Sequence, residues 1–392
     1  IRETFTYECK ESIQVGSRVL VEFRKKKVVG HIVKAVLKKP NFDTIQISEI
    51  LDEEPIFKSN DIDILFWLAD YYQHPIGEVF DTFCPPILRK PVKRNIHSRN
   101  IQPEYKAFSN DKKVTLNKEQ VESLEILNKL DGFDPCLLYG VTGSGKTEIY
   151  LRLTDTYLTK GKSVLILVPE ISLTPQLEDR FVSRFGDNIG IYHSKKTAKQ
   201  RYDIWERAKS GELKIVIGTR SAVLCPLNEL GVIIVDEEHD QSYKQHEGFR
   251  FSARDLSIKR AQVEAIPIVL GTATPSLQTL RWVQEKKYKE AKLLKRANGF
   301  KPPGFITLDI NDSQLESGIA KESLDAITNT LKENKQVLIF INRRGFSPLY
   351  ECSSCRWTAE CSSCDARLVF HHGLNRLICH RCDSAYGVPK KC

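Results

Sequence analysis

The stretch "PCLLYGVTGSGKTEIYLRL", residues 135–153, decides the fold of this chain. An apolar run typical of a strand is followed by a glycine-rich loop and then by a helical pattern. The loop "GVTGSGKT" fits the P-loop pattern G-x-x-x-x-G-K-[ST]. Such a loop cradles phosphates, because its backbone N–H groups converge and the next helix adds the positive end of its dipole. The alternative is a glycine-rich turn with an incidental lysine, which would not require the flanking strand and helix.

The P-loop predicts ATP and Mg²⁺ as cofactors. Lys146 is expected to reach the β and γ phosphates, and the Thr147 hydroxyl is expected to hold Mg²⁺. The nucleotide-binding residues of the loop are Gly140, Val141, Thr142, Gly143, Ser144, Gly145, Lys146 and Thr147.

Five further apolar runs accompany the one before the P-loop, with helical patterns between them. Continuous apolar strands that alternate with helices predict an α/β fold with a parallel sheet covered on both faces. Polar or glycine-rich residues follow most of these runs, at the edge where open α/β sheets bind ligands. The six predicted strands lie in the ranges 135–140, 162–170, 214–220, 231–238, 266–274 and 335–344.

An acidic pair follows one of these strands. Asp236 emerges at the strand end, where a carboxylate can bind Mg²⁺ or its waters, and Glu237 can activate water for attack on the γ phosphate. A small-molecule kinase has less use for such a glutamate, so hydrolysis is favoured over phosphotransfer. A solvated acidic turn is the alternative.

Aromatic and cationic side chains crowd the next residues of the chain. Rings can stack on bases and cations can bind phosphates, so this segment predicts a nucleic-acid sensor beside the acids. Aromatic side chains that serve packing alone are the alternative. The candidate DNA-binding residues here are Tyr243, Lys244, Phe249 and Arg250, with His246, Phe251 and Arg254 in the same segment.

Seven of the eleven cysteines lie in the last 41 residues. They include three C-x-x-C pairs, and two such pairs make a closed tetrahedral Zn²⁺ site of structural type. A thioredoxin-like redox pair is a weaker alternative, because it needs a different fold around a lone pair. The candidate ligands are Cys352, Cys355, Cys361, Cys364, Cys379, Cys382 and Cys392.

Bulk properties narrow the class of protein. The 392 residues carry 59 cationic and 50 acidic side chains, a net charge of +9 that weakly favours polyanionic partners. No apolar run is long enough to span a bilayer, and the first residues lack a secretory pattern, so we expect a cytoplasmic protein without membrane partners. Because the sequence contains no methionine, we expect that residues were trimmed or omitted.

Several short motifs share a family resemblance: "DEEH" (236–239), "VPEISLTPQ" (168–176), "GTRSA" (218–222), "GTATP" (271–275) and "NRRGF" (342–346). They resemble the ordered motifs of superfamily 2 helicases, and their wording most resembles the PriA family, which restarts stalled replication forks. The resemblance implies a RecA-like P-loop lobe and the start of a second lobe, with a small β-rich N-terminal DNA-binding domain and a Cys-rich zinc-binding insertion. The expected divisions are 1–90 (DNA 3′-end binding), 91–114 (linker), 115–300 (lobe 1), 301–346 (start of lobe 2) and 347–392 (zinc-binding insertion).

The resemblance also implies residue roles. Ser172, Thr174, Thr219 and Arg220 would grip the backbone of single-stranded DNA, and Thr272 and Thr274 would relay nucleotide state to it. Gln120 would contact adenine, with an ordinary surface residue as the alternative, and Phe5 and Tyr7 would line a pocket for a DNA 3′ end, with strand core residues as the alternative. The pairs 361/364 and 379/382 would share one zinc, and 352/355 would join Cys392 in a second, incomplete site.

Three departures from the family accompany the resemblance. Thr6 stands where the family has aspartate and Arg24 where it has glycine, which weakens the expectation of 3′-hydroxyl recognition. The linker is too short for the winged-helix domain of many relatives. The arginine that should touch the γ phosphate lies beyond residue 392, so the chain as written should bind nucleotide better than it hydrolyses it.

The sequence therefore predicts an ATP-dependent 3′ to 5′ DNA helicase of replication restart, with Lys146, Thr147, Asp236 and Glu237 as its catalytic set. Its expected partners are single-stranded and forked DNA, single-stranded DNA-binding protein and other primosome proteins. The alternatives are a zinc-stabilised fork-binding scaffold with little ATPase activity, a restriction-type DNA translocase, and an RNA helicase with a similar acidic box.

Overall fold

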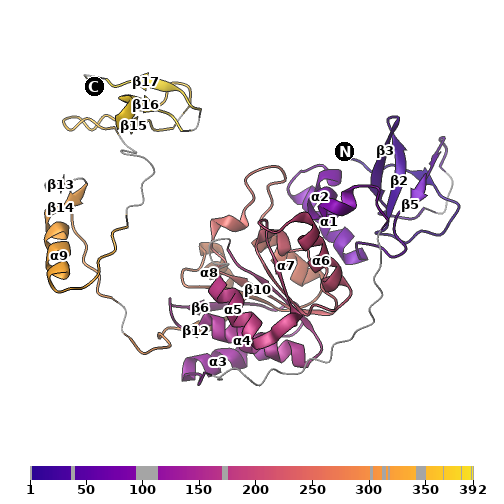
Figure 1. Ribbon diagram of the computed structural model, residues 1–392, viewed down its shortest axis with the longest axis horizontal. Coiled ribbons are helices and arrows are strands. Elements are labelled where there is room, and N and C mark those ends of the chain that lie inside the picture. Colours follow the sequence, from indigo (N-terminus) through magenta and orange to yellow (C-terminus); the bar gives the residue numbers. More distant parts are fainter. Residues whose placement is uncertain are drawn as a thin grey trace. The chain divides into compact units, whose positions relative to one another are not determined.

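The computed structural model describes residues 2–36, 40–93, 114–169, 175–300, 303–310, 315–316, 318–340, 350–364, 366–380, 382–389 and 391. The chain divides into two compact units, residues 1–302 and 303–392 (Figure 1). No helix within the described ranges has the length and apolar character needed to cross a bilayer.

A seven-stranded parallel sheet forms the centre of the first unit, in the order β12-β6-β11-β10-β7-β9-β8. Five predicted strands are confirmed, whereas β8 and β12 were missed because they are short or alternate with charged residues. The strands are β6 Pro135–Gly140, β7 Ser163–Leu167, β8 Ile189–Tyr192, β9 Ile215–Gly218, β10 Leu230–Asp236, β11 Ile268–Thr272 and β12 Lys289–Leu293.

Helices cover both faces of this sheet (Figure 1). One core lies between the sheet and α3 Lys118–Asn128, α4 Lys146–Thr159 and α5 Pro175–Phe185. The other core joins the sheet to α6 Ala198–Lys209 and α7 Ala253–Val263, and it also includes α1 Ser59–Tyr71 and α2 Ile76–Phe83 from the N-terminal module. The remaining elements of the lobe are α8 Leu277–Gln284 and the 3₁₀ turns η2 Gly186–Asn188, η3 Arg220–Ala222 and η4 Gln241–Tyr243.

The N-terminal module, residues 2–93, carries an antiparallel sheet in the order β3-β2-β5 and a short parallel pair, β1 with β4. Strand β3 starts directly after the two-residue turn that follows β2. Arg24 and Lys25 form that turn with φ of +50° and +61°, a conformation for which glycine is favoured. The elements are β1 Tyr7–Glu8, β2 Arg18–Phe23, β3 Lys26–His31, β4 Ile45–Gln46, β5 Glu49–Ile50 and η1 Pro86–Arg89.

A buried ion pair closes this module. Arg18 and Asp52 have side chains that are 0% exposed and 2.6 Å apart, and Arg18 also donates to the carbonyl oxygens of Leu88 and Val92. The pair fixes β2 against the end of the module, because a buried guanidinium needs every one of these acceptors.

His31 makes the stability of this module pH-dependent. Its ring contacts the rings of Phe57 and Phe80, and its Nδ1 is enclosed with no partner among the residues that the structure describes. Burial lowers the pKa of His31 from 6.5 to about 4, although the whole residue keeps some exposure. The folded state therefore resists protonation. We expect the free energy of unfolding of this module to be highest above pH 6.5, where His31 is neutral in both states, and to fall by about 3 kcal/mol as the pH drops to 4. Urea denaturation of wild type and His31→Phe at several pH values checks this, since the phenylalanine variant should lose this part of the slope; equal slopes would contradict it.

The second unit contains two small pieces. The first consists of the hairpin β13 Leu315–Glu316 with β14 Ile319–Ala320 and helix α9 Lys321–Lys332. The predicted strand at 335–344 is not formed over residues 335–340, and residues 341–344 lie outside the described ranges. Leu338 is 93% exposed there, because the described residues around it supply no strand that could pair with this run. The second piece is the three-stranded sheet β15 Val369–His371, β16 Arg376–Ile378 and β17 Ala385–Gly387, with the turn η5 His372–Leu374.

Candidate functional site

The P-loop joins β6 to α4 at the carboxyl edge of the sheet. Gly145 has a φ of +87°, and a Cβ there would lie 2.4 Å from Nε2 of Gln120, so glycine is required. That Nε2 donates to the carbonyl oxygen of Ser144 at 2.9 Å. Gln120 is therefore a buried brace of the loop, 4% exposed, and the alternative of a surface residue is wrong. Its adenine contact stays a prediction.

Lys146 lies between the loop and the acidic pair. Its Nζ donates to the carbonyl oxygen of Gly140 at 3.0 Å and lies 3.4 Å from Oε1 of Glu237. The ammonium group is thus held at the mouth of the loop by two acceptors that phosphate oxygens can replace.

Asp236 ends β10 and is bonded from two sides by tyrosines. The hydroxyl of Tyr150 on α4 donates to its Oδ1 at 2.8 Å, and the hydroxyl of Tyr243 donates to its carbonyl oxygen at 2.6 Å. Burial raises the pKa of Asp236, and the bond from Tyr150 opposes that shift. Burial and the nearby carboxylate raise the pKa of Tyr150 well above its usual value, so it remains a donor. Sequence reasoning missed Tyr150, because it belongs to an ordinary apolar stripe.

These groups line a cavity of about 480 Å³. The P-loop residues form one wall, and Asp236, Glu237, Gln120 and Arg180 contribute to the rest. Ser144 also lines it, and its Oγ is buried without a hydrogen-bond partner among the described residues. An unpartnered hydroxyl beside Lys146 fits a ligand rich in acceptor oxygens, such as a triphosphate with its metal.

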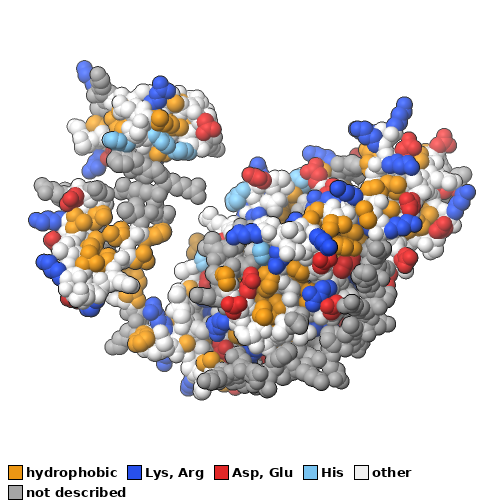
Figure 2. Space-filling model, viewed as in Figure 1, with side chains coloured by type: hydrophobic (Ala, Val, Ile, Leu, Met, Phe, Trp, Pro, Cys, Tyr) orange, Lys and Arg blue, Asp and Glu red, His pale blue; other side chains and the backbone are white. Residues whose placement is uncertain are grey.

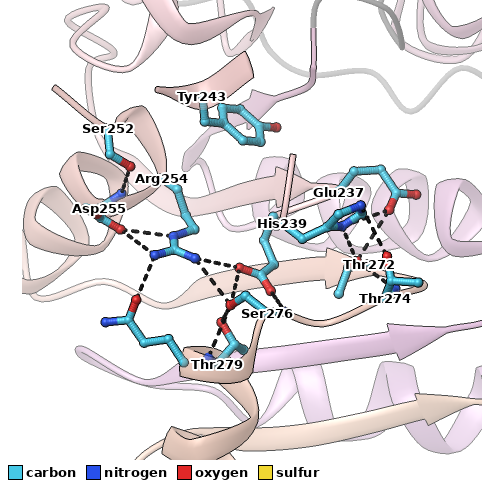
Figure 3. Close-up of polar contacts among 12 residues, drawn as sticks. Glu237, His239, Tyr243, Ser252, Arg254, Asp255, Thr272, Thr274, Ser276 and Thr279 are labelled. Atoms are coloured by element: carbon cyan, nitrogen blue, oxygen red, sulfur yellow. Dashed lines mark hydrogen bonds and ion pairs between the residues drawn. The ribbon is translucent and has the colours of Figure 1, made fainter. Parts of the chain in front are cut away.

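Glu237 connects the acidic motif to the end of β11 (Figure 3). Its backbone has a φ of +44°, an unfavourable conformation for a residue with a Cβ. Its Oε2 lies 3.4 Å from Oγ1 of Thr272 and 3.5 Å from the backbone N of Ala273. The carboxylate that we expect to orient water is therefore within reach of both the P-loop lysine and the "GTATP" motif.

His239 bridges the two hydroxyls of that motif. Its Nδ1 lies 2.7 Å from Oγ1 of Thr272 and its Nε2 lies 3.2 Å from Oγ1 of Thr274 (Figure 3). The structure thus brings both predicted relay residues onto the acidic motif. Glu238, 1% exposed, adds a second link by accepting from the backbone N of Ser276 at 2.7 Å.

Arg254 corrects one prediction. Its guanidinium donates to Glu238, Asp255 and Gln278 at distances of 2.9–3.1 Å, so it is not a free cation for phosphates. It fastens α7 to the acidic motif instead (Figure 3).

Gly271 is expected to be indispensable. A Cβ at this position would lie 1.7 Å from the Tyr150 hydroxyl, which holds Asp236. Gly271→Ala should therefore destabilise the lobe by about 1–3 kcal/mol and weaken Mg²⁺-dependent nucleotide binding. Thermal unfolding and nucleotide titration check this. Adding Tyr150→Phe should restore part of the stability by removing the clashing oxygen, whereas Gly304→Ala, with open space around it, should change neither property. Strictly additive effects would contradict the clash.

The aromatic segment differs from the prediction. Tyr243 and Phe249 are only 2% and 3% exposed, so the expectation of open ring faces for bases is wrong for both. Phe249 packs against the rings of Tyr72, His74 and Phe83 from the N-terminal module, at centroid distances of 5.7, 4.8 and 6.3 Å. Phe249 is a core residue because the module covers it. Lys244 and Arg250 remain exposed and remain candidates.

The other predicted DNA contacts are distributed over the first unit. Thr219 is 3% exposed, and Arg220 donates from Nη1 to the carbonyl oxygens of Ser242 and Lys244, which ties it to the aromatic segment. Ser172 and Thr174 lie outside the described residues. Phe5 is 52% exposed and contacts Phe23 at 4.9 Å, while the Tyr7 hydroxyl donates to the carbonyl oxygen of Glu22 at 3.0 Å.

The second unit assembles a cysteine cluster. The sulfur atoms of Cys361, Cys364, Cys379 and Cys382 all lie within 4.8 Å of one another. Three of the distances are 3.5–3.7 Å, close to the ~3.8 Å edge of a tetrahedron of sulfurs around zinc and far too long for a disulfide. The four residues therefore fit one Zn²⁺. Cys352 and Cys355 do not join a ligand group among the described residues, and Cys392 lies outside them.

Comparisons with known proteins show which families and relatives this chain resembles. Family models match residues 1–85 (3′DNA-binding domain), 117–283 (DEAD/DEAH box helicase) and 361–385 (PriA DNA helicase Cys-rich region domain). The "Replication restart protein PriA" of Haemophilus influenzae is 35% identical over 97% of this chain, and that of Rickettsia felis is 35% identical over 94%. The chain spans 62% and 56% of the lengths of these two relatives. A solved structure of the DUF1998 helicase MrfA gives a TM-score of 0.39 at 17% identity, over 59% of this chain and 36% of that one.

A P-loop with an acidic pair and a "GTATP" motif at the carboxyl edge of a RecA-like parallel sheet defines the class of helicase-type P-loop nucleotide-binding proteins. The matches at both ends of the chain narrow that class. The chain belongs to the PriA family, and the predicted fold class and resemblance are confirmed.

Proposed function

We propose that this chain carries the ATP-driven motor of a DNA helicase that acts in replication restart. The observation that carries the proposal is the contact of Glu237 with both Lys146 and the residues Thr272 and Ala273. The Glu237 carboxylate, which orients water for ATP hydrolysis, thereby contacts the "GTATP" motif, which responds to nucleic acid. Both relatives are named replication restart proteins, which supports a role of this chain in that process.

The residues of the cavity have separate tasks. Lys146 exchanges its contacts with Gly140 and Glu237 for phosphate oxygens, and Ser144 Oγ gains a partner. Thr147 and Asp236 would hold Mg²⁺, which supplies charge neutralisation of the phosphates when bound. Glu237, released from the lysine, positions and deprotonates the attacking water. His239 passes the change to Thr272 and Thr274 through its two ring nitrogens.

Single-stranded and forked DNA are the proposed substrates, with 3′ to 5′ movement, and single-stranded DNA-binding protein and other primosome proteins are the proposed partners in the cytoplasm. The match of residues 1–85 to a 3′DNA-binding domain supports capture of a DNA 3′ end by Phe5 and Tyr7. On the face of the first unit in Figure 2, Lys and Arg side chains are interspersed with Asp and Glu. On this face, particular sites rather than one broad basic stripe are therefore expected to hold the DNA.

ATP turnover measured with and without single-stranded DNA tests the proposal. Because the proposed DNA contacts after β9 and Glu237 after β10 lie at the same carboxyl edge of the sheet, we expect turnover to rise when the DNA is added. Equal turnover under both conditions would overturn the proposed coupling.

A further inference from the structure

A second cavity of about 130 Å³ lies between the N-terminal module and the lobe. Its walls come from the end of α2 and from η1, from α6, and from the segments that follow β8 and β9. Two arginines line it, Arg89 from the module and Arg201 from the lobe, and no aspartate or glutamate of the described ranges does. The cavity therefore lies where two parts of the first unit meet, and its lining is positively charged.

Neither arginine is neutralised. Arg89 donates from Nε to the carbonyl oxygen of Cys84 at 3.1 Å, and Arg201 Nε is buried without a hydrogen-bond partner in the part of the chain that the structure describes. Among the residues that the structure describes, neither guanidinium forms an ion pair. Asp81 is close enough to feel the charge of Arg89, but it is not among the residues that line the cavity. A buried, unpartnered guanidinium nitrogen is costly, so the cavity favours an anion that accepts from it.

The other ionisable side chains of the cavity do not supply the missing charge. Burial raises the pKa of Cys84, Cys225 and Tyr192 to about 12 in each case, so all three are neutral near pH 7. The charges of both arginines lower the pKa of the same Tyr192 hydroxyl, which indicates that the two guanidinium groups lie near one small volume.

The position of the cavity indicates which anion it takes. Tyr192 is the last residue of β8 and Ser221 follows β9, so the cavity lies at the carboxyl edge of the sheet, as the nucleotide site does. Ser221 directly follows Thr219 and Arg220, which we expect to hold the DNA backbone. Gln245, from the aromatic segment, also lines the cavity. The volume suits a single phosphate-sized group rather than a whole nucleotide.

We propose that this cavity is a subsite for one phosphodiester group of the DNA strand, held jointly by Arg89 and Arg201. The inference rests on the proposed function, because it requires that DNA follows the "GTRSA" segment. One phosphate held from both sides would lock the N-terminal module against the lobe. DNA bound along the lobe would then fix the position of the module that matches the 3′DNA-binding domain.

The salt dependence of binding to an oligothymidine tests the subsite. The double variant Arg89→Gln with Arg201→Gln should reduce the slope of log K against log salt by about 0.7, the value for one phosphate of a single strand. Each single variant should reduce it by no more than that. Arg207→Gln removes the same charge from the same helix but bonds Glu212 outside the cavity, so it should leave the slope unchanged.

Three outcomes would overturn the subsite. The first is an unchanged slope in the double variant, and the second is a reduction of the slope by about 1.4, which would mean two separate surface contacts. The third is a reduced slope in Arg89→Lys and Arg201→Lys, because these variants keep the charge. The lysine variants also decide the matter if a glutamine variant fails to fold. Failure of the proposed function is distinguishable, because the wild-type chain would then show no DNA-stimulated ATP turnover even if its oligothymidine binding had the expected slope.

Discussion

Replacing Lys146 with alanine is expected to reduce ATP turnover by about 10²–10³-fold. Its Nζ lies 3.0 Å from the Gly140 carbonyl oxygen and 3.4 Å from Glu237, at the mouth of the P-loop. Without it, no described lysine replaces the charge opposite the β and γ phosphates, and Glu237 loses the partner that holds it before nucleotide binds. Steady-state turnover and titration with a fluorescent ATP analogue measure the two losses separately.

Lys129→Ala is the matched control, because Lys129 is exposed after α3 and does not line the nucleotide cavity. It should bind and turn over ATP as wild type does. Thermal unfolding should show that Lys146→Ala remains folded, since the substitution removes one side chain, 11% exposed, and its contacts with Gly140 and Glu237. Wild-type nucleotide affinity in Lys146→Ala would contradict the assigned role.

Removing zinc, or replacing Cys379 with serine, is expected to unfold the cysteine-rich piece of the second unit. Its core contains five buried residues within the described ranges, Ala359, Cys361, Leu368, Leu377 and Cys379, and two of these belong to the cysteine cluster. Strands of three residues with so small a core cannot fold on apolar burial alone, so the metal supplies the stability. Metal analysis should show the loss of about one zinc equivalent, the capacity of one Cys₄ site.

Hydrogen exchange gives the second readout. Amide protection across β15–β17 should fall to that of an unfolded peptide in Cys379→Ser, while protection of the seven-stranded sheet stays the same. Cys9→Ser, which changes an exposed thiol in the N-terminal module, should retain all zinc and all protection. Protected β15–β17 amides in the presence of a strong chelator would refute the structural role of the metal.

The sequence was most informative where local patterns and chemistry coincide. Apolar runs with glycine or carboxylates at their ends predict the P-loop, the acidic pair and five strands of the sheet. The C-x-x-C spacing predicts that cysteine pairs form a cluster. It was least informative for edge strands such as β12, whose "KEAKL" alternates charged and apolar residues and lacks a continuous apolar run.

The aromatic segment shows the limit most clearly. An exposed sensor and a buried core use the same residue types, so the sequence could not tell that Phe249 would be covered by Tyr72 and Phe83. Those rings are more than 150 residues away along the chain, and only the folded module brings them there.

By itself, then, the sequence determined the candidate residues for phosphate, magnesium and zinc, because each chemistry requires particular side chains at short spacings along one loop. Only the tertiary structure decided the partners of those residues: Tyr150 on Asp236, His239 between two threonines, and two arginines around one cavity. The physical reason is that each of these contacts joins side chains from separate elements, whose meeting depends on sheet order and on the packing of the N-terminal module.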